Sequence, residues 1–168
     1  MPSLEILQPP HPMLKTAAEP VAEIDGALVR LMDDMLSTMY AAPGIGLAAP
    51  QVGVSRRVVV IDLSEAKDTP VRLLNPALTW RSDTFDVAEE GCLSLPGQFA
   101  DVKRHRAVVA SYLDPSGKER TMEAEGLLAR CLQHEIDHLD GILFTDHLSA
   151  LKRNMILRRL IKQRRARA

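Results

Sequence analysis

The sequence of 168 residues has few cysteines, few aromatic residues and no long apolar segment. Its two cysteines form at most one disulfide, and a chain of this length does not depend on one, which favours a reducing, cytoplasmic compartment. Aromatic residues make up only 4%, so we expect a core of Leu, Ile, Val, Ala and Met. No apolar run approaches the ~20 residues of a membrane span, and Glu5 interrupts the stretch that is apolar in a signal peptide. We therefore expect no association with a membrane.

Acidic residues are absent after Asp146, although the net charge of the whole chain is only -1. The first 146 residues hold 13 Lys and Arg against 22 Asp and Glu, a net charge of -9, and the remainder carries +8. The eight basic residues of this remainder are Lys152, Arg153, Arg158, Arg159, Lys162, Arg164, Arg165 and Arg167. The acidic part has no basic patch with interleaved aromatic residues, which argues against sequence-specific nucleic acid binding. The basic segment can contact a polyanion.

The length suits a single domain, and the residue patterns predict its elements. Five prolines predict an extended arm without helix over residues 1–20, and small residues predict a loop over 41–53. Apolar residues at helical spacing predict helices over 24–39, over 127–139 with Gly141 as its stop, and after the cap Ser149. Strands are predicted over 57–63, 71–78, 84–87, 106–113 and 119–124, with a hairpin turn over 114–117.

This order of elements lacks β-α-β alternation and predicts an α+β fold. We expect short antiparallel strands around a buried helix, with a long C-terminal helix. The expected organisation is a catalytic domain over residues 1–147, with a basic helix over 148–168 packed on the same domain. Leu148, Leu151 and Met155 are expected to pack the start of that helix, while its basic residues face solvent.

The buried helix contains the sequence His134-Glu135-Ile136-Asp137-His138. His134 and His138 are four residues apart and lie on one helix face, where both rings can bind one cation. Glu135 lies beside the cation, where a proton-transfer group is useful. The alternative is a pair of hydrogen-bonded histidines on a polar stripe. The burial of the helix favours the metal site, because buried polar groups need partners.

The two cysteines are the candidates for a third ligand. Cys131 is seven residues from His138, about 10.5 Å along the helix axis, so both cannot bind the same ion and Cys131 is expected to be a packing residue. Cys92 follows Gly91, which allows close approach of the backbone, and a thiolate is a strong ligand for a borderline-soft metal. For a lone cysteine a core position is the default. Beside two histidines that need another ligand, Cys92 is expected to complete an open catalytic site.

A third segment, Gly44-Ile45-Gly46-Leu47-Ala48-Ala49-Pro50-Gln51, is rich in small residues. It lacks the spacing and the lysine of a phosphate-binding loop. Such runs usually form tight packed turns. The functional alternative is a backbone wall against a substrate, with the Gln51 amide donating to developing negative charge.

Together, Gly44–Gln51, Glu90–Ser94 and Gln133–His138 resemble the three signature motifs of the peptide deformylase family, in the same order and with similar spacing. The resemblance covers essentially the whole chain and is closest to the bacterial type I members. It implies removal of the formyl group from the N-terminal formyl-methionine of newly synthesised polypeptides, with release of formate. It also implies a preference for Fe2+, with Zn2+ or Ni2+ able to occupy the same site.

The resemblance also implies roles for individual residues. Cys92, His134 and His138 would bind the metal, Glu135 would be the general acid and base, and Gln51 and the backbone N–H of Leu93 would bind the oxyanion. The residues expected around the methionine pocket are Ile45, Gly46, Glu90, Leu127, Arg130 and Cys131. The metal would lower the pKa of a bound water towards ~7, and that water would attack the formyl carbon. Two residues depart from the family pattern: Arg130 stands at an often aliphatic position, and Phe99 stands where some members have arginine.

Two other functions remain open on the sequence. A zinc endopeptidase also uses two histidines and a glutamate in this spacing, although its third ligand is usually a carboxylate or a histidine. A non-catalytic module could use the metal for stability and dock its basic tail on RNA or on a ribosome. Release of formate from a formyl-methionyl peptide separates these alternatives. Ribosome binding through the tail is our expectation, because the implied substrate leaves an RNA-rich particle.

Overall fold

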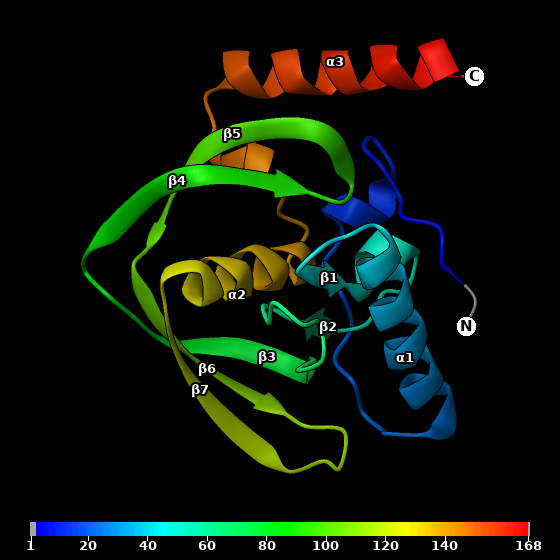
Figure 1. Ribbon diagram of the computed structural model, residues 1–168, viewed down its shortest axis with the longest axis vertical. Helices are drawn as coiled ribbons and strands as arrows, with labels where there is room; N and C mark the ends of the chain where they lie inside the picture. Colours follow the sequence, from blue (N-terminus) through cyan, green and yellow to red (C-terminus); the bar gives the residue numbers. More distant parts are fainter. Residues whose placement is uncertain (1–2, 168) are drawn as a thin grey trace.

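The computed structural model describes residues 3–167 and has the α+β architecture expected from the sequence. One sheet has five antiparallel strands in the order β1-β2-β3-β6-β7, and β4 and β5 form a second, two-stranded sheet. The strands are β1 (Gly46–Ala48), β2 (Val58–Ile61), β3 (Val71–Arg81), β4 (Phe85–Cys92), β5 (Leu95–His105), β6 (Ala107–Leu113) and β7 (Glu119–Glu125). The α-helices are α1 (Gly26–Ala41), α2 (Gly126–Leu139) and α3 (Ala150–Arg167). Helix α2 lies between the two sheets, α1 packs beside β1 and β2, and α3 lies over β5 (Figure 1).

Helix α2 is the central element, as predicted, and ten of its fourteen residues are buried. Its apolar residues, such as Ala129 and Leu132, join a core cluster with residues of the five-stranded sheet. The helix ends at the predicted stop, where Gly141 has a φ of +75°. A side chain at Gly141 would lie 2.6 Å from the carbonyl carbon of Lys15. Glycine is therefore required there both for the backbone conformation and for the close approach of the N-terminal segment.

Helix α1 begins two residues later than predicted because Asp25 caps it. The Asp25 carboxylate accepts a hydrogen bond of 2.9 Å from the backbone N–H of Leu28. Its predicted apolar face is confirmed, with fully buried methionines at 32, 35 and 39 in a cluster that includes Leu47 of β1. This packing holds β1 against the rest of the molecule.

Two segments without a predicted element have regular structure. The predicted loop over 41–53 contains β1, in which Leu47 pairs with Val60 of β2, followed by a 3-10 helix over Ala49–Val52. The N-terminal arm contains a 3-10 helix over Pro12–Lys15. Small residues and prolines gave no local signal for these elements, because the pairing partner and the core impose the conformation. A further 3-10 helix, Phe144–His147, follows α2.

Strands β3 and β4 are longer than predicted, β2 is shorter than the predicted strand over 57–63, and β5 was not predicted at all. Strand β4 extends to Cys92, and β5 pairs with it along its whole length. Strand β3 continues through Pro76, and its register against β6 shifts on either side of Ala77 and Leu78. The predicted β6–β7 hairpin is confirmed, and its turn is closed by a hydrogen bond of 2.9 Å from the Ser116 N–H to the Asp114 carboxylate.

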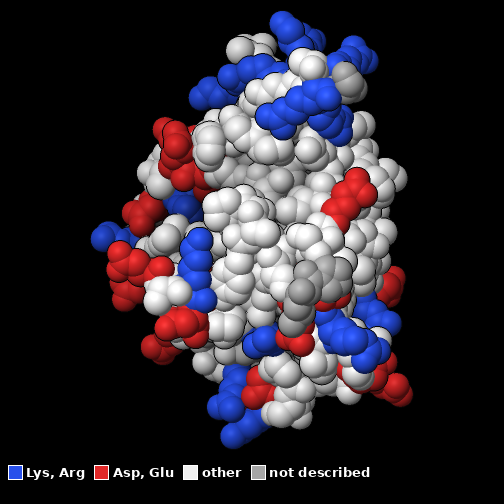
Figure 2. Space-filling view, turned by 45° about the vertical axis from the view of Figure 1, so that its right-hand side comes forward, with Lys and Arg blue, Asp and Glu red and all other residues white. Residues whose placement is uncertain are grey.

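Helix α3 packs on the body through residues other than those expected. Ile156 and Leu160 are buried against β5 and the Phe144–His147 segment, whereas Leu151 is 72% exposed and Met155 is 49% exposed. The expectation for Leu151 and Met155 is therefore wrong, although Leu148 does pack against the core. The basic side chains of α3 gather at the top of the molecule in Figure 2, whereas elsewhere on this face Lys and Arg lie among Asp and Glu. None of the helices within residues 3–167 has both the length and the apolar character that a membrane span requires.

Candidate active site

The predicted metal ligands converge from two elements. Cys92 lies at the end of β4, where the register against β5 shifts, and His134 and His138 lie on successive turns of α2. The Cys92 Sγ is 3.4 Å from the His138 Nε2, which is 3.2 Å from the His134 Nε2. The three ligand atoms all lie within 4.8 Å of one another. Two nitrogens and a thiolate around one point match the donor set of an open catalytic site.

A buried carboxylate fixes the orientation of one histidine. The Nδ1–H of His134 donates to the Glu90 Oε1 at 2.8 Å, which leaves its Nε2 directed towards His138 and Cys92. Such a carboxylate–histidine contact is typical of metal-ligating histidines. Burial raises the pKa of Glu90, but hydrogen bonds from His134 and Arg104 outweigh this effect and lower the pKa to about 2. Glu90 is therefore a charged residue behind the ligands.

Glu135, which follows His134 in the chain, has a carboxylate oxygen that lacks a hydrogen-bond partner within residues 3–167. Its Oε1 is buried and has no hydrogen-bond partner among the described residues. Burial raises the pKa of Glu135 to about 7, so the carboxyl group can take up and release a proton near neutral pH. A buried oxygen without a hydrogen-bond partner lowers the stability of the folded protein. Together with the ligand geometry, this oxygen fits a site that holds a metal and a polar reactant.

Gln51 has an amide that other groups hold in one orientation. Its Oε1 accepts a hydrogen bond of 2.9 Å from the Ala48 N–H, which assigns the NH₂ group to the other side. The Nε2 lies 3.0 Å from the Ser94 Oγ and 3.5 Å from the Cys92 Sγ. The amide therefore presents a donor beside the predicted thiolate ligand.

A cavity of about 640 Å³ opens in front of these groups. His138 is buried beside Cys92 and His134 and does not line the cavity. The cavity is lined by all of the other predicted site residues: Ile45, Gly46, Gln51, Glu90, Cys92, Leu93, Leu127, Arg130, Cys131, His134 and Glu135. Cys131 is buried and stands outside the group of metal-capable residues, in line with the expected packing role. Burial raises the pKa of its thiol well above the usual value. The structure thus brings the predicted residues together around one cavity.

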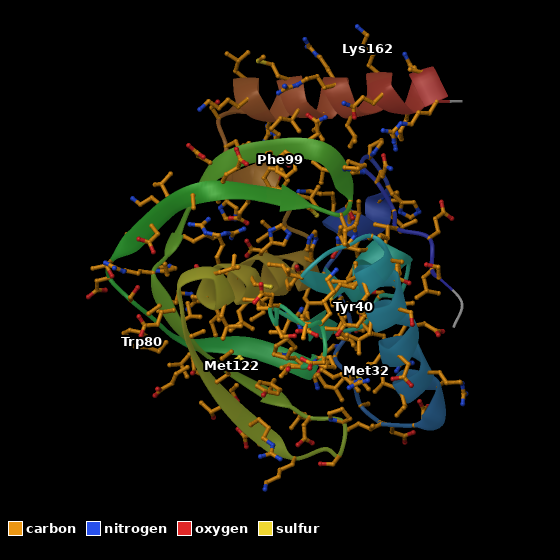
Figure 3. All side chains as sticks on the ribbon, in the orientation of Figure 1. Met32, Tyr40, Trp80, Phe99, Met122 and Lys162 are labelled. Atoms are coloured by element: carbon orange, nitrogen blue, oxygen red, sulfur yellow. The ribbon has the colours of Figure 1, made fainter. Side chains whose placement is uncertain are left out.

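The sequence analysis missed part of the cavity wall because it missed β5. The wall includes the start of this strand, and Phe99 is 59% exposed at the rim of the cavity. Figure 3 shows Phe99 on the β4–β5 hairpin. Its ring covers Gly91, where an added side chain would lie 2.6 Å from the ring. Local composition gave no signal for this wall, because apolar, small and polar residues follow one another without a period from Leu95 onward.

Arg104 is a second residue that the sequence analysis missed. Its guanidinium donates two hydrogen bonds to Glu90, at 2.9 and 3.1 Å, and one of 2.6 Å to Asp137. The ion pairs with Glu90 and Asp137 raise the pKa of Arg104 even though burial opposes them. An arginine in the run Lys103–Arg106 looks like a solvent-facing residue in the sequence, so local composition gave no signal for its burial.

The sequence model of the polypeptide deformylase family matches residues 3–154, a range that contains every predicted site residue. The chain belongs to the peptide deformylase family. A peptide deformylase from Rhizorhabdus wittichii is 52% identical over 169 residues, and one from Agrobacterium fabrum is 49% identical over 159 residues. The alignments cover 96% and 94%, respectively, of both this chain and the relative.

Solved peptide deformylases have the same fold. The structure from Legionella pneumophila superposes with a TM-score of 0.95 at 45% identity and covers 99% of this chain and 98% of that one. The structure from Ehrlichia chaffeensis in complex with actinonin has a TM-score of 0.93 at 39% identity and covers 97% and 98%. The protein is thus a metal-dependent hydrolase that deformylates newly synthesised polypeptides. The endopeptidase and the non-catalytic module are excluded as alternatives.

Proposed function

We propose that Cys92, His134 and His138 bind one Fe2+ ion and that the adjoining cavity receives the formyl-methionine end of the nascent chain. The observation that carries this assignment is the convergence of the three ligand atoms within 4.8 Å beside the unpartnered oxygen of Glu135. When bound, the ion supplies a Lewis acid that polarises the formyl oxygen and makes water nucleophilic at neutral pH.

The residues around the ion would have separate roles in the reaction. Glu135 accepts a proton from the attacking water and delivers it to the leaving amine, for which a pKa of about 7 is suitable. The Gln51 Nε2–H and the backbone N–H of Leu93 donate to the formyl oxygen as its negative charge develops. Glu90 keeps the His134 ring in the orientation that a metal ligand needs.

The methionine side chain of the substrate would occupy the part of the cavity lined by Ile45, Leu127 and Cys131. Ile45 and Leu127 are 43% and 58% exposed, so a substrate that covers them would remove apolar surface from water. An unbranched thioether suits such a wall because it adapts to irregular apolar surfaces. Gly46 and Glu90 complete the wall that we assign to this pocket.

Replacing Glu135 tests the assignment most directly. Glu135→Gln keeps the size of the side chain but removes proton transfer, so release of formate from a formyl-Met-Ala-Ser peptide should fall by at least ~10²-fold. Elemental analysis should still find one metal ion per chain. Cys92→Ala is the matched comparison and should lose the metal as well as the activity. Near-normal turnover by Glu135→Gln, or full metal occupancy in Cys92→Ala, would contradict the assignment.

The choice of Fe2+ over Zn2+ or Ni2+ rests on the family resemblance, because the donor set accepts all three ions. Elemental analysis of protein purified without oxygen, followed by turnover measured after reloading with each ion, tests the preference for Fe2+. Equal turnover with all three ions and zinc as the sole native metal would refute it.

We propose a cytoplasmic location on two grounds: the substrate is a chain emerging from synthesis, and Cys92 and Cys131 are unpaired.

We also propose that the basic helix α3 (Ala150–Arg167), which packs on the rest of the domain, docks on the ribosome; Ala168, the last residue of the expected helix, lies outside the described residues. Six of the eight basic side chains of α3 are exposed, and Lys162 extends away from the rest of the molecule (Figure 3). The rest of the chain is acidic, so an attraction to ribosomal RNA would act through this helix.

Charge neutralisation tests docking without disturbing the core. A truncation after Asn154 would remove the buried Ile156 and Leu160, so the sharper variant is the triple change of Arg158, Arg159 and Lys162 to Gln. Co-sedimentation with ribosomes should fall and lose its steep salt dependence, while hydrolysis of small peptides persists. The matched control changes three exposed basic residues elsewhere to Gln: Lys67, Arg81 and Lys118. Equal sedimentation of both triple variants would show that α3 is only a solvated surface.

A further inference from the structure

Arg130 and His134 lie on one face of α2, and both donate hydrogen bonds to the Glu90 carboxylate. They are four residues apart on this helix, so their side chains lie one turn from each other. The Arg130 Nη1 donates to the Glu90 Oε2 at 2.8 Å, and the His134 Nδ1 donates to the Glu90 Oε1 at 2.8 Å. Arg130 is buried, with 8% of its surface exposed. The arginine therefore contacts the carboxylate that orients a metal ligand.

Arg130 also binds the backbone of both strands of the β4–β5 hairpin. Its Nη1 donates to the Val102 carbonyl of β5 at 2.8 Å, and its Nη2 donates to the Asp86 carbonyl of β4 at 3.0 Å. The hairpin carries Cys92 at the end of β4, whereas the two histidine ligands are on α2. One side chain thus spans the gap between the two elements that supply the ligands.

We propose that Arg130 is a positioning residue that fixes the separation of the hairpin and α2 and thereby slows release of the metal. This proposal rests on the metal site assigned above. In a metal site, a small change in the separation of two elements weakens every ligand bond at once, and loss of an outer contact typically costs 10–100-fold in affinity. Charge-assisted hydrogen bonds in a buried site are the strong ones, so three of them give a firm connection.

A second arginine, Arg104, also pairs with Glu90. Arg104 donates two hydrogen bonds to this carboxylate, so Glu90 keeps a cationic partner when Arg130 is replaced. Arg130→Met keeps the length and the apolar stem of the side chain and removes all three contacts. We therefore expect a folded protein in which the hairpin is held less firmly against α2.

The experiment measures metal release from the loaded protein into an excess of a chromophoric chelator. Arg130→Met should release the metal at least ~10-fold faster than the wild type. Arg130→Lys should restore part of the difference, because a lysine keeps the charge but replaces the planar fork by one ammonium group. The absorption spectrum of the cobalt-substituted protein, which reports the coordination geometry, should shift in Arg130→Met and return towards wild type in Arg130→Lys.

Arg57 provides a matched control at the other end of α2. Its Nη1 donates to the Leu139 carbonyl at 2.9 Å and its Nη2 to the Asp140 carboxylate at 3.0 Å, but it contacts neither Glu90 nor the ligands. Arg57→Met should lower the free energy of unfolding without changing metal release. Equal acceleration in Arg57→Met and Arg130→Met, or wild-type release by Arg130→Met, would overturn the proposal. Metal retention in Cys92→Ala would instead refute the metal site itself.

Discussion

Gly46 allows a direct test of how closely the position of Glu135 is controlled. An added Cβ at Gly46 would lie 2.6 Å from the Glu135 Oε2 and 3.0 Å from the Cys131 Sγ. Ordinary contact begins at 3.4 Å, so the carboxylate must move by the difference between 3.4 and 2.6 Å, which is about 0.8 Å. Gly46 itself cannot retreat easily, because it is paired with Ile61 in the sheet.

This displacement sets the size of the expected effect. A misplacement of about 1 Å at a reacting group can cost ~10²-fold in rate, so kcat/KM for formate release from Gly46→Ala should fall by about that factor. Overpacking of a buried site costs ~1–3 kcal/mol in the free energy of unfolding, which urea denaturation of the metal-loaded protein measures. None of the three atoms nearest to the new methyl group belongs to a metal ligand, so metal content should remain at one ion per chain.

Two further variants test whether displacement of the Glu135 carboxylate causes the loss of activity in Gly46→Ala. Glu135→Asp alone should be slow, but combined with Gly46→Ala it should lose less activity than the two single effects predict, because the shorter side chain leaves room for the methyl group. Gly26→Ala is the control for a glycine change, since its Cβ would meet only the end of the Arg30 side chain at the start of α1. Turnover by Gly46→Ala within about threefold of wild type would show that the carboxylate position is not critical.

Three other predictions concern packing, acid stability and specificity. Leu160→Ala should lower the free energy of unfolding by about 2–5 kcal/mol, whereas Leu151→Ala should change it by less than ~0.5 kcal/mol, as measured by urea denaturation. Burial raises the pKa of Asp62, but hydrogen bonds, above all from Ser64, outweigh it and lower the pKa to about 2. Its stabilising effect is complete above pH ~4 and is lost towards pH ~2, so the stability difference from Asp62→Asn should shrink over that range. Phe99→Arg should raise the kcat/KM ratio of peptides with an acidic residue after methionine to those with an apolar one, and an unchanged ratio would place Phe99 outside substrate contact.

The sequence was sufficient to predict the central helix and the chemistry on it. His134 and His138 have the spacing that puts two rings on one face, and the apolar residues around them require burial, so two independent patterns agree. Cys92 could be chosen over Cys131 because the rise of an α-helix places Cys131 too far from His138 for both to bind one ion. These predictions depend on residues that are close in sequence, where helix geometry fixes the distances.

Strand β5 could not be predicted, because its buried side is partly charged. The residues at 98, 102 and 104 are buried, and two of these three, Gln98 and Arg104, are polar, so the strand shows no alternation of apolar and polar residues. The anchors of α3 were misassigned for a related reason. Leucine, isoleucine and methionine occur on several faces of this helix, and the preceding Phe144–His147 segment decides which face meets the body.

Arg130 shows why a departure from a family pattern needs the structure for its interpretation. An arginine at an often aliphatic pocket position suggests a changed specificity when only the sequence is available. In the fold its charge is paired with Glu90, which lies 40 residues earlier in the chain, and two carbonyl groups accept its other hydrogen bonds. The cluster contains two buried arginines, Arg104 and Arg130, together with the buried Glu90 and the half-buried Asp137, so each arginine has a carboxylate partner. A buried arginine is tolerated where such partners already exist, and the same contacts that neutralise it connect the hairpin to the helix that carries the histidine ligands.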